Sequence, residues 1–223
     1  MRMSRWLWVI AFVLAGLAPA WAVNVLDLKT EYAATSVIGS GANVREGRLW
    51  RTPNALRHEM FEGGRQQIAI ARLDRKLAWL LLPDQRLAIE MGLESFGLPV
   101  GLLTGSGLKQ TPVGQETIDG RRTTKVRVER EPGASGPQFE GFVWTTAEGI
   151  VMKVVGTGEH EGRRGAVNVS FRDVRPGRQD PALFEVPAGY RRLVLNGVDL
   201  QSFLAGLEQL RALGQGRVPI PGR

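Results

Sequence analysis

The sequence predicts an all-β protein: an antiparallel sheet, strongly curved or closed into a barrel, with one C-terminal helix. Two observations predict this class. Short apolar or alternating segments follow one another from residue 27 to residue 175, separated by turn-forming residues, as in a β-meander. These segments also recur at regular intervals, which is typical of barrels and curved sheets.

The first 22 residues have the three-part pattern of a secretory signal peptide. Arg2 and Arg5 precede the apolar run Trp6–Leu17, and Ala20-Trp21-Ala22 matches a cleavage site. This run is shorter than the roughly 20 residues of a membrane-spanning helix, although an uncleaved anchor is the alternative. We therefore expect cleavage after Ala22 and an exported mature chain without a transmembrane segment.

The composition is basic and lacks cysteine. Lys and Arg number 29 against 22 Asp and Glu, giving a formal net charge of +7. An exported basic protein would favour anionic lipid head groups or other acidic envelope surfaces, and a scattered solvated surface is the alternative. No nucleic-acid motif is present, so we expect no nucleic-acid partner. Without cysteine there are no disulfides, and the core alone must stabilise the fold.

The clearest strands lie within residues 66–91. Ile68 and Ile70 alternate with small or polar residues, two polar turns flank the apolar segment 77–82, and alternation resumes to Met91. Allowing for errors at the boundaries, the whole chain predicts about eleven strands. They are three within 66–91 and one in each of 27–38, 43–51, 55–62, 113–118, 121–130, 138–145, 149–158 and 166–174.

Two segments interrupt the strand pattern. Residues 92–108 are apolar yet rich in glycine, which is too irregular for a confident helix. Residues 199–213 predict an amphipathic helix, with Asp199 as N-cap and Gly214 after its end. Its apolar face holds Leu200, Phe203, Leu204, Leu207 and Leu210. We expect a single domain over residues 23–214 and a disordered tail over 215–223.

The segment Leu77–Leu82 is apolar on both faces, although a strand with one solvated face should alternate. One explanation is core packing, with helix 199–213 on one side of the sheet and segment 92–108 on the other. The second is that residues 92–108 form a mobile cover over a cavity that holds an apolar ligand, with glycines as hinges. The two explanations are compatible.

The sequence offers few residues for catalysis. His58 and His160 are the only histidines, neither has metal-ligand spacing, and no known catalytic or phosphate-binding motif is present. We expect no enzyme activity, no metal and no cofactor.

Several short motifs resemble the LolA-like superfamily of periplasmic proteins, which includes the outer-membrane lipoprotein carrier. They are Arg57–Met60, Gln67–Asp74, Trp79–Gln85, the tryptophan–glycine–lysine hairpin Val143–Lys153, and the closing Phe184–Tyr190. The resemblance implies an unclosed β-barrel of about eleven strands with a cover, an apolar interior and a periplasmic location. Strand-like residues begin almost at Asp27, so the N-terminal helix of the true carrier is missing and the uncharacterised members are more similar.

The resemblance implies a periplasmic protein that holds lipid or lipoprotein acyl chains in a concave cavity. The alternative is an envelope regulatory or protein-interaction module with the same fold and no transported ligand. If there is a cavity, we expect one set of residues in its wall and a second set in its cover. The wall set is Leu77, Trp79, Leu81, Leu87, Ile89, Met91, Phe142, Trp144 and Phe171, and the cover set is Phe96, Leu98, Leu102 and Leu103. Alternate residues of a strand share one face of the sheet, but this rule leaves open which face of 77–82 points inward.

Overall fold

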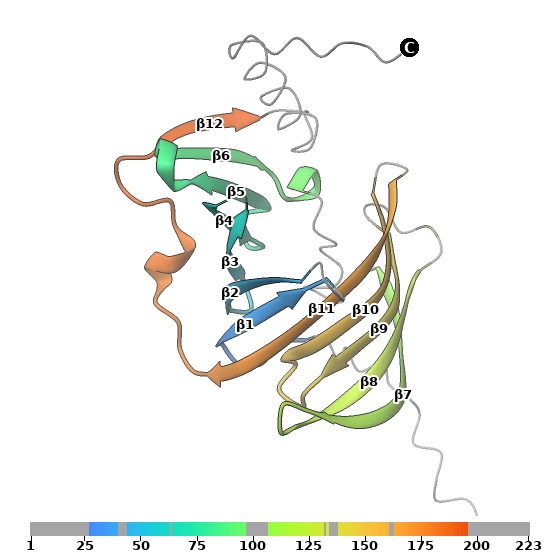
Figure 1. The fold of residues 1–223 in the computed structure, drawn as a ribbon. Coiled ribbons are helices and arrows are strands. Elements are labelled where there is room, and N and C mark those ends of the chain that lie inside the picture. Colours follow the sequence, from blue (N-terminus) through green and yellow to red (C-terminus); the bar gives the residue numbers. More distant parts are fainter. Residues whose placement is uncertain are drawn as a thin grey trace, which may run out of the picture.

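A computed structural model shows a single, strongly curved β-sheet (Figure 1). It describes residues 27–39, 44–62, 64–96, 107–131, 133, 138–160 and 163–195. These residues form strands and three short 3₁₀ helices, with no α-helix among them. The predicted signal peptide, helix 199–213 and tail 215–223 lie outside the described residues.

The described residues contain twelve strands. They are β1 (Tyr32–Ile38), β2 (Arg45–Arg51), β3 (Ala55–Glu62), β4 (Arg65–Arg72), β5 (Leu77–Leu82), β6 (Leu87–Gly92), β7 (Leu108–Ile118), β8 (Arg121–Arg130), β9 (Gln138–Thr145), β10 (Val151–His160), β11 (Arg163–Pro176) and β12 (Arg191–Leu195). The 3₁₀ helices are η1 (Pro83–Gln85), η2 (Leu93–Phe96) and η3 (Pro181–Phe184).

The sheet is mostly antiparallel and does not close. Its strand order is β12-β6-β5-β4-β3-β2-β1-β11-β10-β9-β8-β7, so β12 and β7 are its two edges. Neighbouring strands are antiparallel except β12, which runs parallel to β6. The pairing of β1 with β11 joins the two halves of the meander, and Figure 1 shows these halves turning toward each other.

The concave face carries most of the core. Here the inward residues of β1–β5 pack with those of β10 and β11, including Tyr32, Leu49, Leu56, Ala78 and Met152. A second cluster continues over β7–β10. Because every strand contributes alternate residues to this face, the curvature brings distant parts of the chain together.

The convex face of β2–β5 is covered by the chain that connects β11 to β12. We call residues 177–190 the strap, and Figure 1 shows it in orange along the outside of these strands. Phe184 is buried there with Ile70, Trp79 and Leu81. Arg57 Nη1 donates to the carbonyl of Leu183 at 2.9 Å, which fixes the strap to β3.

The predicted all-β, antiparallel and unclosed architecture is confirmed, with two differences in the strands. The expected number was about eleven, whereas the described residues form twelve, and the additional strand is β12. Strand β7 begins at Leu108 instead of residue 113. The predicted turns after β4 and β5 are present, and each ends in a residue with left-handed backbone, Lys76 (φ 55°) and Arg86 (φ 47°).

Candidate functional site

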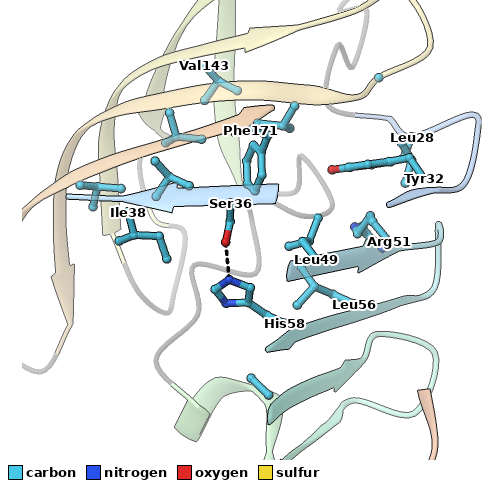
Figure 2. Close-up of a pocket in the computed structure, with 16 residues that line it drawn as sticks. Leu28, Tyr32, Ser36, Ile38, Leu49, Arg51, Leu56, His58, Val143 and Phe171 are labelled. Carbon is cyan, nitrogen blue, oxygen red and sulfur yellow. Dashed lines mark hydrogen bonds between the residues drawn. The ribbon is translucent and has the colours of Figure 1, made fainter. Parts of the chain in front are cut away.

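The concave face contains a cavity of about 270 Å³. Side chains from β3 and β9 both reach it, although β2, β1, β11 and β10 lie between these strands in the sheet. Sheet curvature therefore creates the cavity. Its described wall consists of Leu28, Tyr32, Ser36, Ile38, Leu49, Arg51, Leu56, His58, Ala69, Val143, Gly149, Val151, Val154, Val167, Val169 and Phe171 (Figure 2).

The wall has one apolar side and one side that contains polar groups. Valines of β9, β10 and β11 and the ring of Phe171 form one side, which offers only apolar atoms from its side chains. The opposite side, from β1, β2 and β3, contains four polar side chains: Tyr32, Ser36, Arg51 and His58. No acidic residue is among the described lining residues.

Two of the polar side chains form a hydrogen bond with each other. Ser36 Oγ lies 2.6 Å from His58 Nε2, and Ser36 is buried. Burial lowers the pKa of His58 below its ordinary value of 6.5, and the nearby Glu59 carboxylate only partly opposes this shift. The imidazole is therefore neutral at neutral pH.

Tyr32 and Arg51 form a second polar pair at one end of the cavity. They are direct neighbours in the β1–β2 register, and each is 4% exposed. Arg51 Nη1 donates to the carbonyl of Ala55 at 3.0 Å and also to that of Thr52. Burial lowers the pKa of Arg51, and it raises the pKa of Tyr32 to about 12, against a smaller opposing effect of the Arg51 charge.

No described residue makes a hydrogen bond to the Tyr32 hydroxyl, although the side chain is almost fully buried. Figure 2 shows this hydroxyl directed toward the interior of the cavity. At neutral pH the phenol is protonated, so it can donate a hydrogen bond to a group inside the cavity.

Of the residues predicted to line a cavity, only Phe171 lies in this wall. Leu87, Ile89 and Met91 are on the concave face, where Ile89 and Met91 pack with Leu80 in a separate cluster beyond the wall.

Leu77, Trp79 and Leu81 lie on the convex face under the strap. The register pairs Leu80 with Ile89, and Ala78 with Met91. The two predicted sets from β5 and β6 therefore face opposite sides of the sheet, and the expectation that both point inward is wrong.

The remaining predicted residues are elsewhere. Phe142 and Trp144 lie on the convex face, where the Lys125 ammonium is 4.8 Å from the first ring and 5.0 Å from the second. Lys153 is 4.9 Å from the Trp144 ring. Of the predicted cover, Leu98, Leu102 and Leu103 and the side chain of Phe96 are outside the described part of the chain.

The polar residues of the wall were not among those predicted from the sequence. A signal was present: Tyr32, Ala34, Ser36 and Ile38 alternate in β1, and Leu56, His58 and Met60 alternate in β3. Parity therefore already placed a serine, a tyrosine and a histidine on apolar faces.

The described residues contain no group of three or more His, Cys, Asp or Glu that could hold a metal ion. Within the same part of the chain, no helix has the length and apolar character to span a membrane. By its lining residues, the cavity wall is suited to holding an apolar body beside a few hydrogen-bonding groups.

No protein-family model matches the chain, and no curated protein sequence matches it either. Solved structures do resemble it. A conserved protein from Thermus thermophilus is 14% identical with a TM-score of 0.48, over 76% of this chain and 93% of that protein. MucB of Pseudomonas aeruginosa, solved in a complex with MucA, is 14% identical with a TM-score of 0.45, over 78% of this chain and 62% of MucB.

A putative outer-membrane lipoprotein-sorting protein domain from Vibrio parahaemolyticus is 9% identical with a TM-score of 0.33, over 69% of this chain and 89% of that domain. The chain spans less than two thirds of the length of MucB. These likenesses concern the course of the backbone alone.

Proposed function

We propose that this protein is a periplasmic binding protein that holds an apolar ligand, such as a lipid or acyl chain, in the concave cavity. The observation that supports the proposal is the cavity itself. Eleven of its sixteen described lining residues are Ala, Val, Leu, Ile or Phe. Apolar pockets of this kind, with a few polar groups, are the usual form of small-molecule sites.

The periplasmic location in this proposal rests on the signal-peptide pattern of residues 1–22. Binding is favoured over catalysis because no acidic residue is among the described lining residues, and the nearby Glu59 carboxylate is paired with Arg57. A serine nucleophile normally needs a base that is itself oriented by a third group.

The first experiment is native mass spectrometry of protein purified without detergent, combined with titration of N-phenyl-1-naphthylamine, a neutral apolar fluorescent probe. We expect a co-purified lipid or saturable probe binding. The variant Ala69→Leu extends a side chain into the cavity from β4 and should weaken probe binding.

The matched control is Ala33→Leu, which adds the same atoms on β1 outside the cavity wall, where Ala33 lines a separate pocket of about 70 Å³. Its probe affinity should equal that of the wild type. Absence of both co-purified lipid and saturable probe binding in the wild-type protein would overturn the proposal.

A protein-interaction module is the second candidate, supported by edge strand β12. Leu193 and Val194 are 38% and 53% exposed, and β12 pairs only with β6 among the described strands. An exposed apolar edge is a site where a partner can add a strand. If Leu193→Lys and Val194→Lys abolish capture of an envelope protein while the wild type binds no lipid, this second candidate replaces the first.

A further inference from the structure

A second apolar surface lies on the concave face, near the β12 edge of the sheet, and we call it the edge cluster. Leu80, Ile89 and Met91 are its most buried members, at 5%, 0% and 2% exposed. Its partly buried members are Leu82, Leu87 and Leu195. The edge cluster adjoins the cavity, because Ala69 of the cavity wall is the register partner of Leu80.

The edge cluster needs a layer over its concave side. It is built by β5, β6 and β12, which lie side by side at one edge of the sheet (Figure 1), so its side chains point the same way. Such side chains shield each other's flanks but not their outer ends, and a buried sheet face packs against another layer.

The neighbouring described elements pack elsewhere. Within the part of the chain that the structure describes, the strap packs on the opposite, convex face through Phe184. Leu93 of η2 packs in the cluster of Tyr32 and Leu49. The layer over the edge cluster is therefore to be sought among the remaining residues of the chain or in a partner.

The course of the chain leads to this surface. Leu195 belongs to the edge cluster and is the last residue of β12. Asn196-Gly197 follows, a dipeptide typical of tight turns. Asp199, the predicted N-cap, is four residues after Leu195 and so lies within about 14 Å of it, even along a fully extended chain. An element that begins at Asp199 therefore starts next to the edge cluster.

Segment 199–213 matches the edge cluster in polarity. As a helix it places five large apolar side chains on one side, whereas Ser202 and Gln209 lie on the other. The other apolar segment outside the strands, 97–106, contains three glycines and Pro99 within ten residues, which disfavours a regular apolar face. Segment 199–213 is thus the better occupant.

The dimensions also agree. A helix of the 15 residues 199–213 is about 22 Å long. The edge cluster spans about 10 Å across its three strands and about 13 Å along β6 from Leu87 to Met91. One helix is therefore long enough to cover the edge cluster.

We propose that the edge cluster is the docking site of the chain's own segment 199–213, which packs as an amphipathic helix on the concave face of β5, β6 and β12. The docked helix borders the cavity at Ala69. Its side chains that contact the edge cluster are Leu200, Phe203, Leu204, Leu207 and Leu210. The inference does not depend on what the cavity binds, because it concerns the neighbouring surface.

The test uses thiol reactivity, because the natural chain contains no cysteine. Ile89→Cys places one thiol in the edge cluster. Its rate of reaction with a water-soluble maleimide is measured in the full mature chain and in a chain that ends at Val198. We expect truncation to raise this rate on the order of 100-fold, because a covered core position reacts only after the structure opens.

The matched control is Ile70→Cys. Ile70 is 0% exposed like Ile89, but it packs with Phe184 of the strap, which truncation leaves in place. Its reaction rate should be the same in both chains. An unchanged rate for Ile89→Cys after truncation would overturn the inference and leave residues 97–106 as the cover from within the chain.

Other occupants give different results in the full chain. A reaction rate of Ile89→Cys that falls as the protein concentration rises would identify a second copy as the cover. Rapid reaction of this thiol at every protein concentration would mean that the edge cluster is open to a different partner. Either result would contradict docking of segment 199–213.

Cross-linking of the full chain keeps the inference testable if the truncated chain does not fold. Leu82→Cys with Leu207→Cys pairs the edge cluster with segment 199–213, whereas Leu77→Cys with Leu207→Cys pairs the convex face of the same strand with it. We expect a short bismaleimide to link only the first pair within one molecule, as measured by protease digestion and mass spectrometry. Linkage of the second pair alone, or of neither pair, would overturn the inference.

Discussion

The Ser36 hydroxyl on β1 bonds Nε2 of His58 on β3 across the intervening strand β2, at 2.6 Å. This bond can form because residue 47 on β2 is a glycine. A Cβ atom there would lie 2.7 Å from His58 Nε2, 2.9 Å from Ser36 Oγ and 2.6 Å from the Glu59 carbonyl oxygen. The lack of a side chain at Gly47 therefore leaves room for a hydrogen bond that connects β1 to β3 across β2 at the wall of the cavity.

The first prediction concerns this glycine. Gly47→Ala should lower the free energy of unfolding by about 1–3 kcal/mol, because the backbone oxygen of Glu59 cannot move aside without shifting β3. Urea denaturation measures the change. Gly92→Ala is the matched control, since no atom lies within 4 Å of the added Cβ. Equal stability of the two variants would show that the gap at residue 47 is not needed.

The second prediction concerns the pH dependence of stability. Burial lowers the pKa of His58 in the folded protein below 6.5, so the unfolded chain binds a proton first as the pH falls. The free energy of unfolding should therefore decrease below about pH 6.5 and level off below the folded-state pKa of His58. Above that window His58 is neutral in both states and adds no slope.

Chemical denaturation of the wild type and His58→Gln between about pH 8 and pH 5 isolates this contribution. Carboxylates that titrate in both proteins cancel in the difference between the two profiles. The wild type should lose stability relative to the variant on acidification. A relative gain by the wild type would mean that His58 is protonated more easily in the folded state.

Local turn chemistry explains which strands could be predicted from the sequence. The β4–β5–β6 meander could be predicted because each of its turns is a short polar segment of consecutive residues. These turns are Leu73–Lys76 and Pro83–Gln85. Strand β7 was predicted to begin only at residue 113, directly after Pro112, a residue typical of turns, and Gly114 lay inside the predicted strand. The structure places both at a bulge in an edge strand, where the missing N–H and the extra residue are tolerated.

Strand β12 and the cavity wall depend on distant residues. Arg191–Leu195 pairs in parallel with β6, far earlier in the chain, and no local pattern indicates such pairing. The sequence predicts that both faces of Leu77–Leu82 are buried. The alternation of side chains within one strand does not indicate which of these faces the strap covers. The predicted wall contained only apolar residues, so it did not include Tyr32, Ser36, Arg51 and His58.

The third prediction concerns the strap. Phe184 is 3% exposed and packs with Ile70 and Trp79 on the convex face. Phe184→Ala should lower the free energy of unfolding by about 3–5 kcal/mol, through lost burial and a cavity under the strap. Phe61→Ala removes an equal side chain that is 68% exposed and should change it by less than about 0.5 kcal/mol. A small loss in both variants would mean that the strap adds little to stability.

The last prediction separates the two faces of the β5–β6 hairpin. Trp79 Nε1 donates to Glu90 Oε2 at 2.8 Å on the convex face, whereas Met91 is buried on the concave face with Leu80 and Ile89. Trp79→Phe leaves the Glu90 carboxylate without this donor and should cost about 1–3 kcal/mol of stability. Met91→Ala should cost about 2–5 kcal/mol, because it creates a cavity in the core.

The affinity of Trp79→Phe for the apolar probe tests which face of the sheet holds the ligand. N-phenyl-1-naphthylamine should bind to Trp79→Phe as it binds to the wild type, because the ring lies on the face opposite the cavity. Titration of the folded variants with the probe and urea denaturation of the same samples give both quantities. Strongly weakened binding by Trp79→Phe without loss of stability would place the ligand on the convex face and contradict the assignment of the concave cavity.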